Sequence, residues 1–269
     1  MNLRLLGNKR STFKSHQINC SMKFPSITLF ALASFVACTP PAKESRIADW
    51  AGQSLNLEHL KSERDSFIML NQSGEKVGGM IWEKHREANR YVHNDVSYFD
   101  DGSIYEEASF LFTLEPLTID SIVTDMKTPA ASMSINFAMN DKKVTGPALV
   151  KRDTSERSIA IDSLLQYDVA REEIYSLIHC IQLEDLTEMK LRVLNSLGLT
   201  IANATITLLG KESLTTPYGS YETFKLDLNG GGVIPDNIIW IQESPRKIVK
   251  VKVGQPELEV LLAKTSPLD

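Results

Sequence analysis

From Ser66 onward, apolar and polar residues alternate in short runs that are separated by turn residues. Such alternation is typical of half-buried β-strands. It predicts strands at residues 67–70, 77–82, 91–99, 104–113, 132–139 and 144–150. The Asp101-Gly102 pair between two of these runs predicts a tight hairpin, because glycine adopts the positive φ that such turns need. Residues 66–150 are therefore expected to form an antiparallel meander.

The period of the pattern changes after residue 160. Apolar residues recur there at helical spacing, at Ile161, Leu164, Leu165, Val169, Ile174, Leu177, Ile178 and Ile181. This pattern predicts one long helix at about residues 160–180, with its apolar stripe against a sheet. Alternation then returns and predicts strands at 189–193, 204–208, 211–226 (a strand, a turn and a second strand), 238–241, 247–253 and 258–262.

The N-terminal segment has a different character. A single lysine, Lys23, precedes the apolar run Ile27–Ala37, which ends at Cys38 and is followed by two prolines. The layout resembles the signal peptide and lipobox of bacterial lipoproteins, although Phe35 stands where leucine is usual. The apolar run is shorter than the roughly 20 residues that a membrane-spanning helix needs. An ordinary cleaved secretory signal with an incidental cysteine is the alternative.

The resemblance implies that Cys38 is lipidated and becomes the N-terminus of the mature protein. Residues 1–37 are then a signal peptide, whose true start is Met22 or Met1, and residues 38–64 are a lipid-anchored tether. Threonine rather than aspartate follows Cys38. By the sorting rules of lipoproteins, Thr39 implies anchoring at the periplasmic face of the outer membrane. Within the tether, Trp50 and three leucines form a weak amphipathic patch, which is expected to make a capping helix or to pack on the domain edge.

Charge and cysteine content narrow the function classes. Residues 1–37 hold five of the 29 Lys and Arg residues and none of the 34 acids, so processing leaves 24 bases, 34 acids and a net charge of −10. An acidic chain is a poor partner for nucleic acid or anionic lipid headgroups, so membrane attachment is assigned to the lipid on Cys38. Cys180 is then the one remaining free thiol, and it is interpreted as a core residue rather than a nucleophile.

The C-terminal part carries a recognisable order of turn and packing motifs. The succession is Gly210-Lys211-Glu212, then Thr216 to Thr223, then Trp240-Ile241 and Pro245 to Val249. It resembles uncharacterised bacterial periplasmic proteins that are similar in architecture to the lipoprotein carriers LolA and LolB. The resemblance implies a mainly β (α+β) fold over residues 65–264. In this fold a strongly curved antiparallel half-barrel has one long helix packed on its concave side, over an apolar cavity for acyl chains.

No catalytic or metal-binding motif appears in the sequence. His85 and His93 lack the spacing of a zinc site and are interpreted as solvated residues at strand edges. The acidic group Asp100, Asp101, Glu106 and Glu107 is interpreted as solubilising a hairpin, with Glu106 and Glu107 on opposite faces. The basic residues between 246 and 252 are interpreted as the solvated face of an edge strand. No metal, cofactor or catalytic residue is predicted.

Strand aromatics supply the candidate ligand site. They either line a cavity or pack against the helix as core, and the candidate lining is Trp82, Tyr91, Tyr105, Phe112, Leu177, Phe224 and Trp240. The expected function is a non-enzymatic, outer-membrane-anchored lipoprotein that binds or shuttles an apolar (lipid or acyl) ligand or assists envelope assembly. The alternative is a structural or interaction module whose concave face is filled. A periplasmic hydrolase ranks third.

Overall fold

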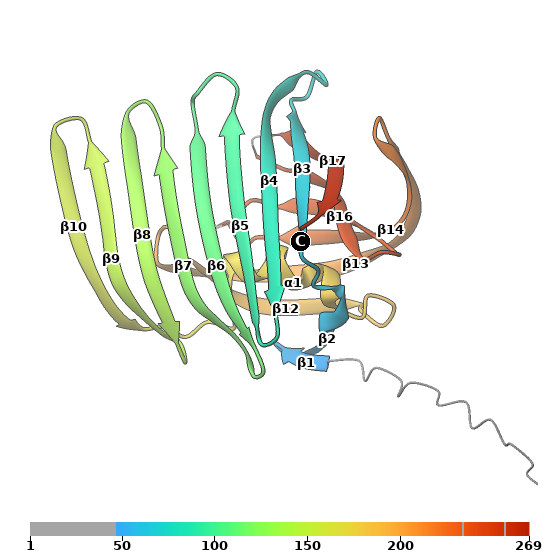
Figure 1. Cartoon of the computed structure of the whole chain (residues 1–269), viewed down its shortest axis with the longest axis horizontal. Helices are drawn as coiled ribbons and strands as arrows, with labels where there is room; N and C mark the ends of the chain where they lie inside the picture. The colour runs from blue at the N-terminus through green and yellow to red at the C-terminus, as the bar shows by residue number, and fades with distance from the viewer. Residues whose placement is uncertain (1–46, 233, 256, 269) are drawn as a thin grey trace, which may run out of the picture. The chain divides into compact units, whose positions relative to one another are not determined.

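Two antiparallel meanders make up most of the protein (Figure 1). The computed structural model describes residues 47–232, 234–255 and 257–268. In the first meander each strand pairs with the next along the chain. The alternation predicts this antiparallel order, but the strands at 117–127 and 155–164 are not among those predicted. Its strands are β3 (Glu63–Leu70), β4 (Lys76–Glu87), β5 (Arg90–Phe99), β6 (Tyr105–Leu114), β7 (Leu117–Lys127), β8 (Ala131–Asn140), β9 (Lys143–Arg152) and β10 (Ser155–Leu164).

The second meander follows a short helical segment. The chain passes through β11 (Val169–Ala170), helix α1 (Arg171–Leu177) and the 3-10 turn η2 (Ile178–Cys180). β11 pairs in parallel with β12, and the remaining strands pair antiparallel in chain order. These strands are β12 (Glu188–Asn195), β13 (Thr200–Thr216), β14 (Gly219–Asn229), β15 (Asn237–Gln242), β16 (Lys247–Val253) and β17 (Leu258–Pro267).

Pairing of β17 with β3 joins the meanders into one sheet of fifteen strands within the described residues. The sheet is mainly antiparallel, as predicted, but it is neither curled into a half-barrel nor closed. Its end strands are β10 and β11. A helical segment of ten residues is about 15 Å long, which spans about three strands at about 4.8 Å spacing. Such a segment is too short to serve as an axis around which fifteen strands curl.

The prediction of a long helix at 160–180 is wrong in both the length of the helix and its first residue. Residues 155–164 form β10 and pair along their whole length with β9, across a two-residue turn at Asp153-Thr154. Ile159 and Ile161 are half-buried at a period of two, so the apolar residues near 160 belong to a strand. Helical residues begin at Arg171 and end at Cys180. The apolar residues of this part, including Ile174, Leu177 and Ile178, are fully buried.

Residues 47–60, predicted as part of a tether, belong to the folded unit. They form a two-stranded hairpin, β1 (Ile47–Trp50) and β2 (Gln53–Asn56), followed by the 3-10 turn η1 (Leu57–His59). Four apolar side chains of this segment are buried: Trp50, Leu55, Leu57 and Leu60. The indole Nε1 of Trp50 also donates to Glu173 Oε1 on α1 at 3.3 Å. The segment therefore packs against the helix, and residues 1–46, with Cys38, lie outside the described residues.

A buried group of charged side chains lies where the meanders meet. Lys84 Nζ is 2.7 Å from Asp65 Oδ2, and Lys247 Nζ is 3.2 Å from Asp65 Oδ1. Both lysines also pair with Glu63, at 3.1 and 2.6 Å, and Thr265 Oγ1 donates to Asp65 Oδ1 at 2.6 Å. We call these five residues the ion cluster. They come from β3, β4, β16 and β17, so the cluster links both meanders.

The ion cluster corrects one prediction. The basic residues between 246 and 252 were expected on the solvated face of an edge strand, yet β16 is an interior strand between β15 and β17. Lys247 is buried in the ion cluster, and Lys252 is exposed. Lys250 Nζ lies 5.1 Å from the centre of the Trp240 ring and pairs with Glu259.

Neither helical segment among the described residues has the length and apolar character to cross a membrane.

Candidate functional site

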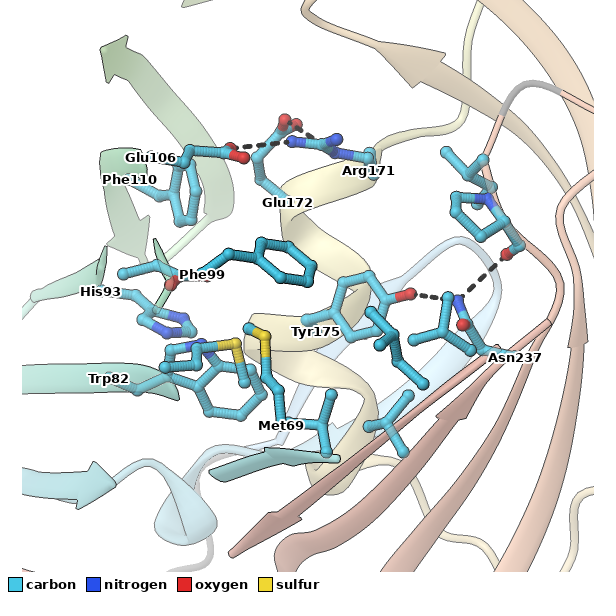
Figure 2. Close-up of a pocket in the computed structure, with 18 residues that line it drawn as sticks. Met69, Trp82, His93, Phe99, Glu106, Phe110, Arg171, Glu172, Tyr175 and Asn237 are labelled. Carbon is cyan, nitrogen blue, oxygen red and sulfur yellow. Dashed lines mark hydrogen bonds and ion pairs between the residues drawn. The ribbon is translucent and has the colours of Figure 1, made fainter. Parts of the chain in front are cut away.

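A cavity of about 280 Å³ lies between helix α1 and strands of both meanders. Figure 2 shows α1 passing behind it, with β4 to β6 on one side and β15 to β17 on the other. Apolar side chains supply most of its wall. The lining residues are Met69, Met80, Trp82, His93, Asp95, Phe99, Glu106, Phe110, Arg171, Glu172, Tyr175, Ile234, Pro235, Asn237, Val251, Val253, Leu258 and Val260.

Strand alternation brings the first wall together. Side chains two residues apart point to the same face, so His93, Asp95 and Phe99 on β5 all face the cavity. Trp82 is the register partner of Asp95, and its ring lies 5.1 Å from that of His93 in an edge-to-face arrangement. The close aromatic packing gives this wall a fixed shape.

Helix α1 contributes the second wall. Arg171 and Tyr175 are four residues apart and therefore share one face of the helix, which points into the cavity (Figure 2). The Tyr175 hydroxyl accepts a hydrogen bond from Asn237 Nδ2 at 2.6 Å. That contact ties the helix to β15 of the second meander. Burial of the phenol raises the pKa of Tyr175 to about 12.

Carboxyl groups and one guanidinium gather at one end of the cavity. Arg171 Nε lies 3.3 Å from Glu172 Oε1, and Arg171 Nη2 lies 3.6 Å from Glu106 Oε1. Glu172 Oε1 also accepts from the Ser196 hydroxyl at 2.6 Å. Asp95 is half-buried, and desolvation of its carboxyl raises the pKa of Asp95 to about 6. At pH 7 this carboxyl is therefore less completely ionised than that of an ordinary aspartate, although it is still mainly ionised.

His93 is a buried neutral side chain rather than a solvated one. Its Nδ1 lies 2.7 Å from Ser176 Oγ on α1, and burial lowers the pKa of His93 to about 3. The prediction of two solvated histidines is correct for His85, which is exposed, and wrong for His93. Lys84 is the register partner of His93 and also lowers its pKa. The pair of His93 and Ser176 thus joins the sheet to the helix.

Among the seven predicted lining residues, Trp82 lines the cavity. Tyr91, Phe112 and Leu177 do not line it and are fully buried in the core. Tyr105 and Trp240 each lie one position along their strand from a residue that lines the cavity or points inward. Neighbouring residues of a strand point to opposite faces, so these two side chains lie on the other face of the sheet. Tyr105 is exposed, and Phe224 is buried with the Arg246 guanidinium 4.5 Å from its ring centre.

The prediction for the acidic group is correct in part. Glu107 is exposed and Glu106 faces the cavity, as alternation predicts. Glu106 pairs with Arg171, however, so it does more than solubilise a hairpin. The sequence pattern missed this role because Arg171 is 65 positions away.

Cys180 is fully buried, and burial raises the pKa of its thiol, which agrees with its interpretation as a core residue. Across residues 47–268, apart from 233 and 256, no group of three or more His, Cys, Asp or Glu is placed to hold a metal ion.

Comparisons with known proteins inform the fold. No protein-family model matches the chain, and no curated protein matches it either. The chain is similar to the crystal structure of a beta-barrel-like protein of a domain of unknown function, DUF1849, from Brucella abortus, with 10% identity and a TM-score of 0.52. The alignment covers 78% of this chain and 99% of that chain.

A second solved structure is more distant. It is a putative exported protein with YmcC-like fold from Bacteroides fragilis, with 8% identity and a TM-score of 0.29, covering 77% of this chain and 96% of that chain. At 10% identity, the similarity to the Brucella protein shows a shared fold and no more. The protein shares the fold of the beta-barrel-like Brucella protein over most of its length.

Proposed function

We propose that the protein is a lipid-anchored protein of the bacterial envelope that binds or shuttles an apolar ligand in the cavity beside α1. The observation that carries the proposal is the cavity itself. It is lined mainly by apolar and aromatic side chains and has a few polar groups at defined places, which is the usual composition of a site for a small molecule. No catalytic constellation is needed for this function.

The volume of the cavity limits the size of the ligand. Ligand pockets usually measure about 300–1,000 Å³, so a volume of about 280 Å³ lies just below this range. A site of this size suits one small molecule better than the several acyl chains of a lipoprotein. The proposed cargo is therefore one small apolar molecule.

The ligand proposal predicts a saturable interaction that depends on the cavity. The purified protein should release a small apolar molecule on solvent extraction, and it should take up a fluorescent medium-chain lipid analogue until the site is full. Binding to the folded state alone should raise the free energy of unfolding by about 2.7 kcal/mol at a hundredfold excess over Kd. Mass spectrometry of the extract and thermal unfolding with the analogue measure these effects.

A pair of matched variants connects binding with the cavity. Leu258→Trp adds bulk to a half-buried lining residue, and Leu209→Trp makes the same change at an exposed position on β13. The first variant should lose most of the uptake, and the second should keep it, provided that circular dichroism shows both folded. If the unmodified protein yields no ligand and binds no analogue, the structural or interaction module replaces the binding function.

The anchor is proposed at Cys38, at the periplasmic face of the outer membrane, because of the lipobox pattern and Thr39. We expect Cys38→Ala to leave the protein either soluble in the periplasm or retained as an uncleaved precursor. Fractionation and intact-mass measurement distinguish these forms from the lipidated wild type. A wild-type protein whose mature N-terminus is unmodified and lies at another residue would contradict the anchor.

A further inference from the structure

The charged side chains around the cavity are not balanced. Three lining residues carry carboxyl groups, Asp95, Glu106 and Glu172, and one carries a permanent positive charge, Arg171. His93, the remaining titratable nitrogen group of the lining, is neutral because burial lowers its pKa to about 3. Counted by formal charge, the wall has an excess of two negative charges. Such an excess in a partly desolvated site favours a cation.

The hydrogen bonds of the wall leave acceptors unused. Glu172 Oε1 contacts Arg171 and Ser196, whereas Glu172 Oε2 has no partner among the described residues although the side chain is 1% exposed. On the opposite wall, Asn237 donates through Nδ2 to Tyr175 and Pro235, and its Oδ1 has no partner in the described part of the chain. Trp82 Nε1, a donor, and His93 Nε2 also lack a partner among the described residues. Buried polar atoms usually have a partner, so the two free oxygens at Glu172 and Asn237 point to a ligand that donates hydrogen bonds at those positions.

The rest of the lining suits an organic cation better than a metal ion. Four aromatic side chains face the cavity, Trp82, Phe99, Phe110 and Tyr175, and their ring faces attract ammonium groups. Figure 2 places the Phe99 and Tyr175 rings between the carboxylate end and the apolar strands. Beyond them the wall is aliphatic, from Met69, Val251 and Val260.

We propose that the ligand of this cavity is an apolar amine, whose ammonium group lies at Asp95, Glu106 and Glu172 and whose hydrocarbon body lies against β3, β16 and β17. The inference rests on the proposed ligand-binding function and names its chemical class. A fatty-acid anion is disfavoured, because its carboxylate would meet the excess negative charge. Arg171, the cation that could bind it, already pairs with two glutamates.

Three probes with the same eight-carbon chain test the inference: octylammonium, octanol and octanoate. The full chain is measured in lipid nanodiscs, with empty nanodiscs as the blank, by titrating each probe and following tryptophan emission. Trp82 is in the cavity wall and reports on occupancy. We expect saturable binding of octylammonium, with an affinity roughly tenfold above that of octanol and a larger margin over octanoate. Partition of a probe into the lipid is not saturable and does not depend on the cavity residues.

Variants that remove one charge without changing shape identify the ammonium site. Glu172→Gln keeps an acceptor for Ser196, and Glu106→Gln changes a side chain that is 26% exposed. Each should lower the affinity for octylammonium roughly tenfold, toward the affinity for octanol. The matched control is Glu83→Gln on β4, an exposed glutamate paired with Arg64 outside the cavity, which should leave all three affinities unchanged.

The possible results separate the inference from the function on which it rests. Selective binding of octylammonium that is lost in the two cavity variants and kept in Glu83→Gln supports the amine. Equal binding of the three probes, or tightest binding of octanoate, overturns the amine but leaves the ligand-binding function in place. Absence of saturable binding for every probe overturns both.

Discussion

Replacing Asp65 with alanine is expected to lower the free energy of unfolding by about 3–5 kcal/mol, as is typical when one partner of a buried ion pair is removed. Asp65 is fully buried and contacts Lys84, Lys247 and Thr265. Its loss leaves two buried ammonium groups with Glu63 as their remaining carboxylate in the ion cluster. The loss also weakens the place where β3 meets β17. Urea unfolding followed by circular dichroism measures the change.

An exposed ion pair on the same strands is the control. Arg64 and Glu83 pair across β3 and β4 with both side chains more than 40% exposed, so Glu83→Ala should cost less than about 1 kcal/mol. If Asp65→Ala were as mild as Glu83→Ala, the ion cluster would contribute little to the joint between the meanders.

The effect of Asp65→Ala should depend on pH in a defined direction. Burial alone raises the pKa of Asp65, but the ammonium groups of Lys84 and Lys247 outweigh burial and hold the pKa below its ordinary value of 3.8. A depressed folded-state pKa stabilises the protein above the unfolded-state pKa, and this stabilisation is lost as pH falls through the folded-state pKa. The difference between wild type and variant should be full at neutral pH and shrink below about pH 4. A constant difference down to pH 2 would contradict this account.

Leu177→Ala is the second variant with a large expected effect, a loss of about 2–5 kcal/mol in the free energy of unfolding. Leu177 is fully buried near the end of α1. Truncation removes apolar contacts and leaves a cavity that the neighbouring strands fill only in part. The midpoint of urea unfolding should fall, with little change in the slope of the transition.

Leu209→Ala provides the comparison for Leu177, because Leu209 is 53% exposed on β13. We expect this variant to lie within about 0.5 kcal/mol of wild type, the usual range for surface substitutions. A near-zero change for Leu177→Ala as well would mean that α1 contributes little to the core. The cavity would then lack a rigid wall on the helix side.

Much of the secondary structure could be predicted from the sequence, because a strand with one buried face has apolar residues at every second position. The hairpins around Asp101-Gly102 and Asn140 to Lys143 follow from local turn chemistry together with that period. Residues 155–164 form a strand although their apolar residues also fit the spacing of a helix. Ile161, Leu164 and Leu165 fit a helical spacing, and pairing with β9 makes the first two of them part of a strand instead.

Only local features can therefore be predicted from the residue pattern: a mainly β chain, its meanders, and one buried helical segment around Ile174 and Leu177. Three features depend on the folded sheet: the joint between β3 and β17, the burial of Lys247 and the pairing of Glu106 with Arg171. These contacts join residues far apart in the chain, and burial of apolar faces from both meanders brings them together. The sequence pattern around a charged strand residue is the same whether its side chain faces water or a buried partner. The role of such a residue is therefore known only from the complete sheet.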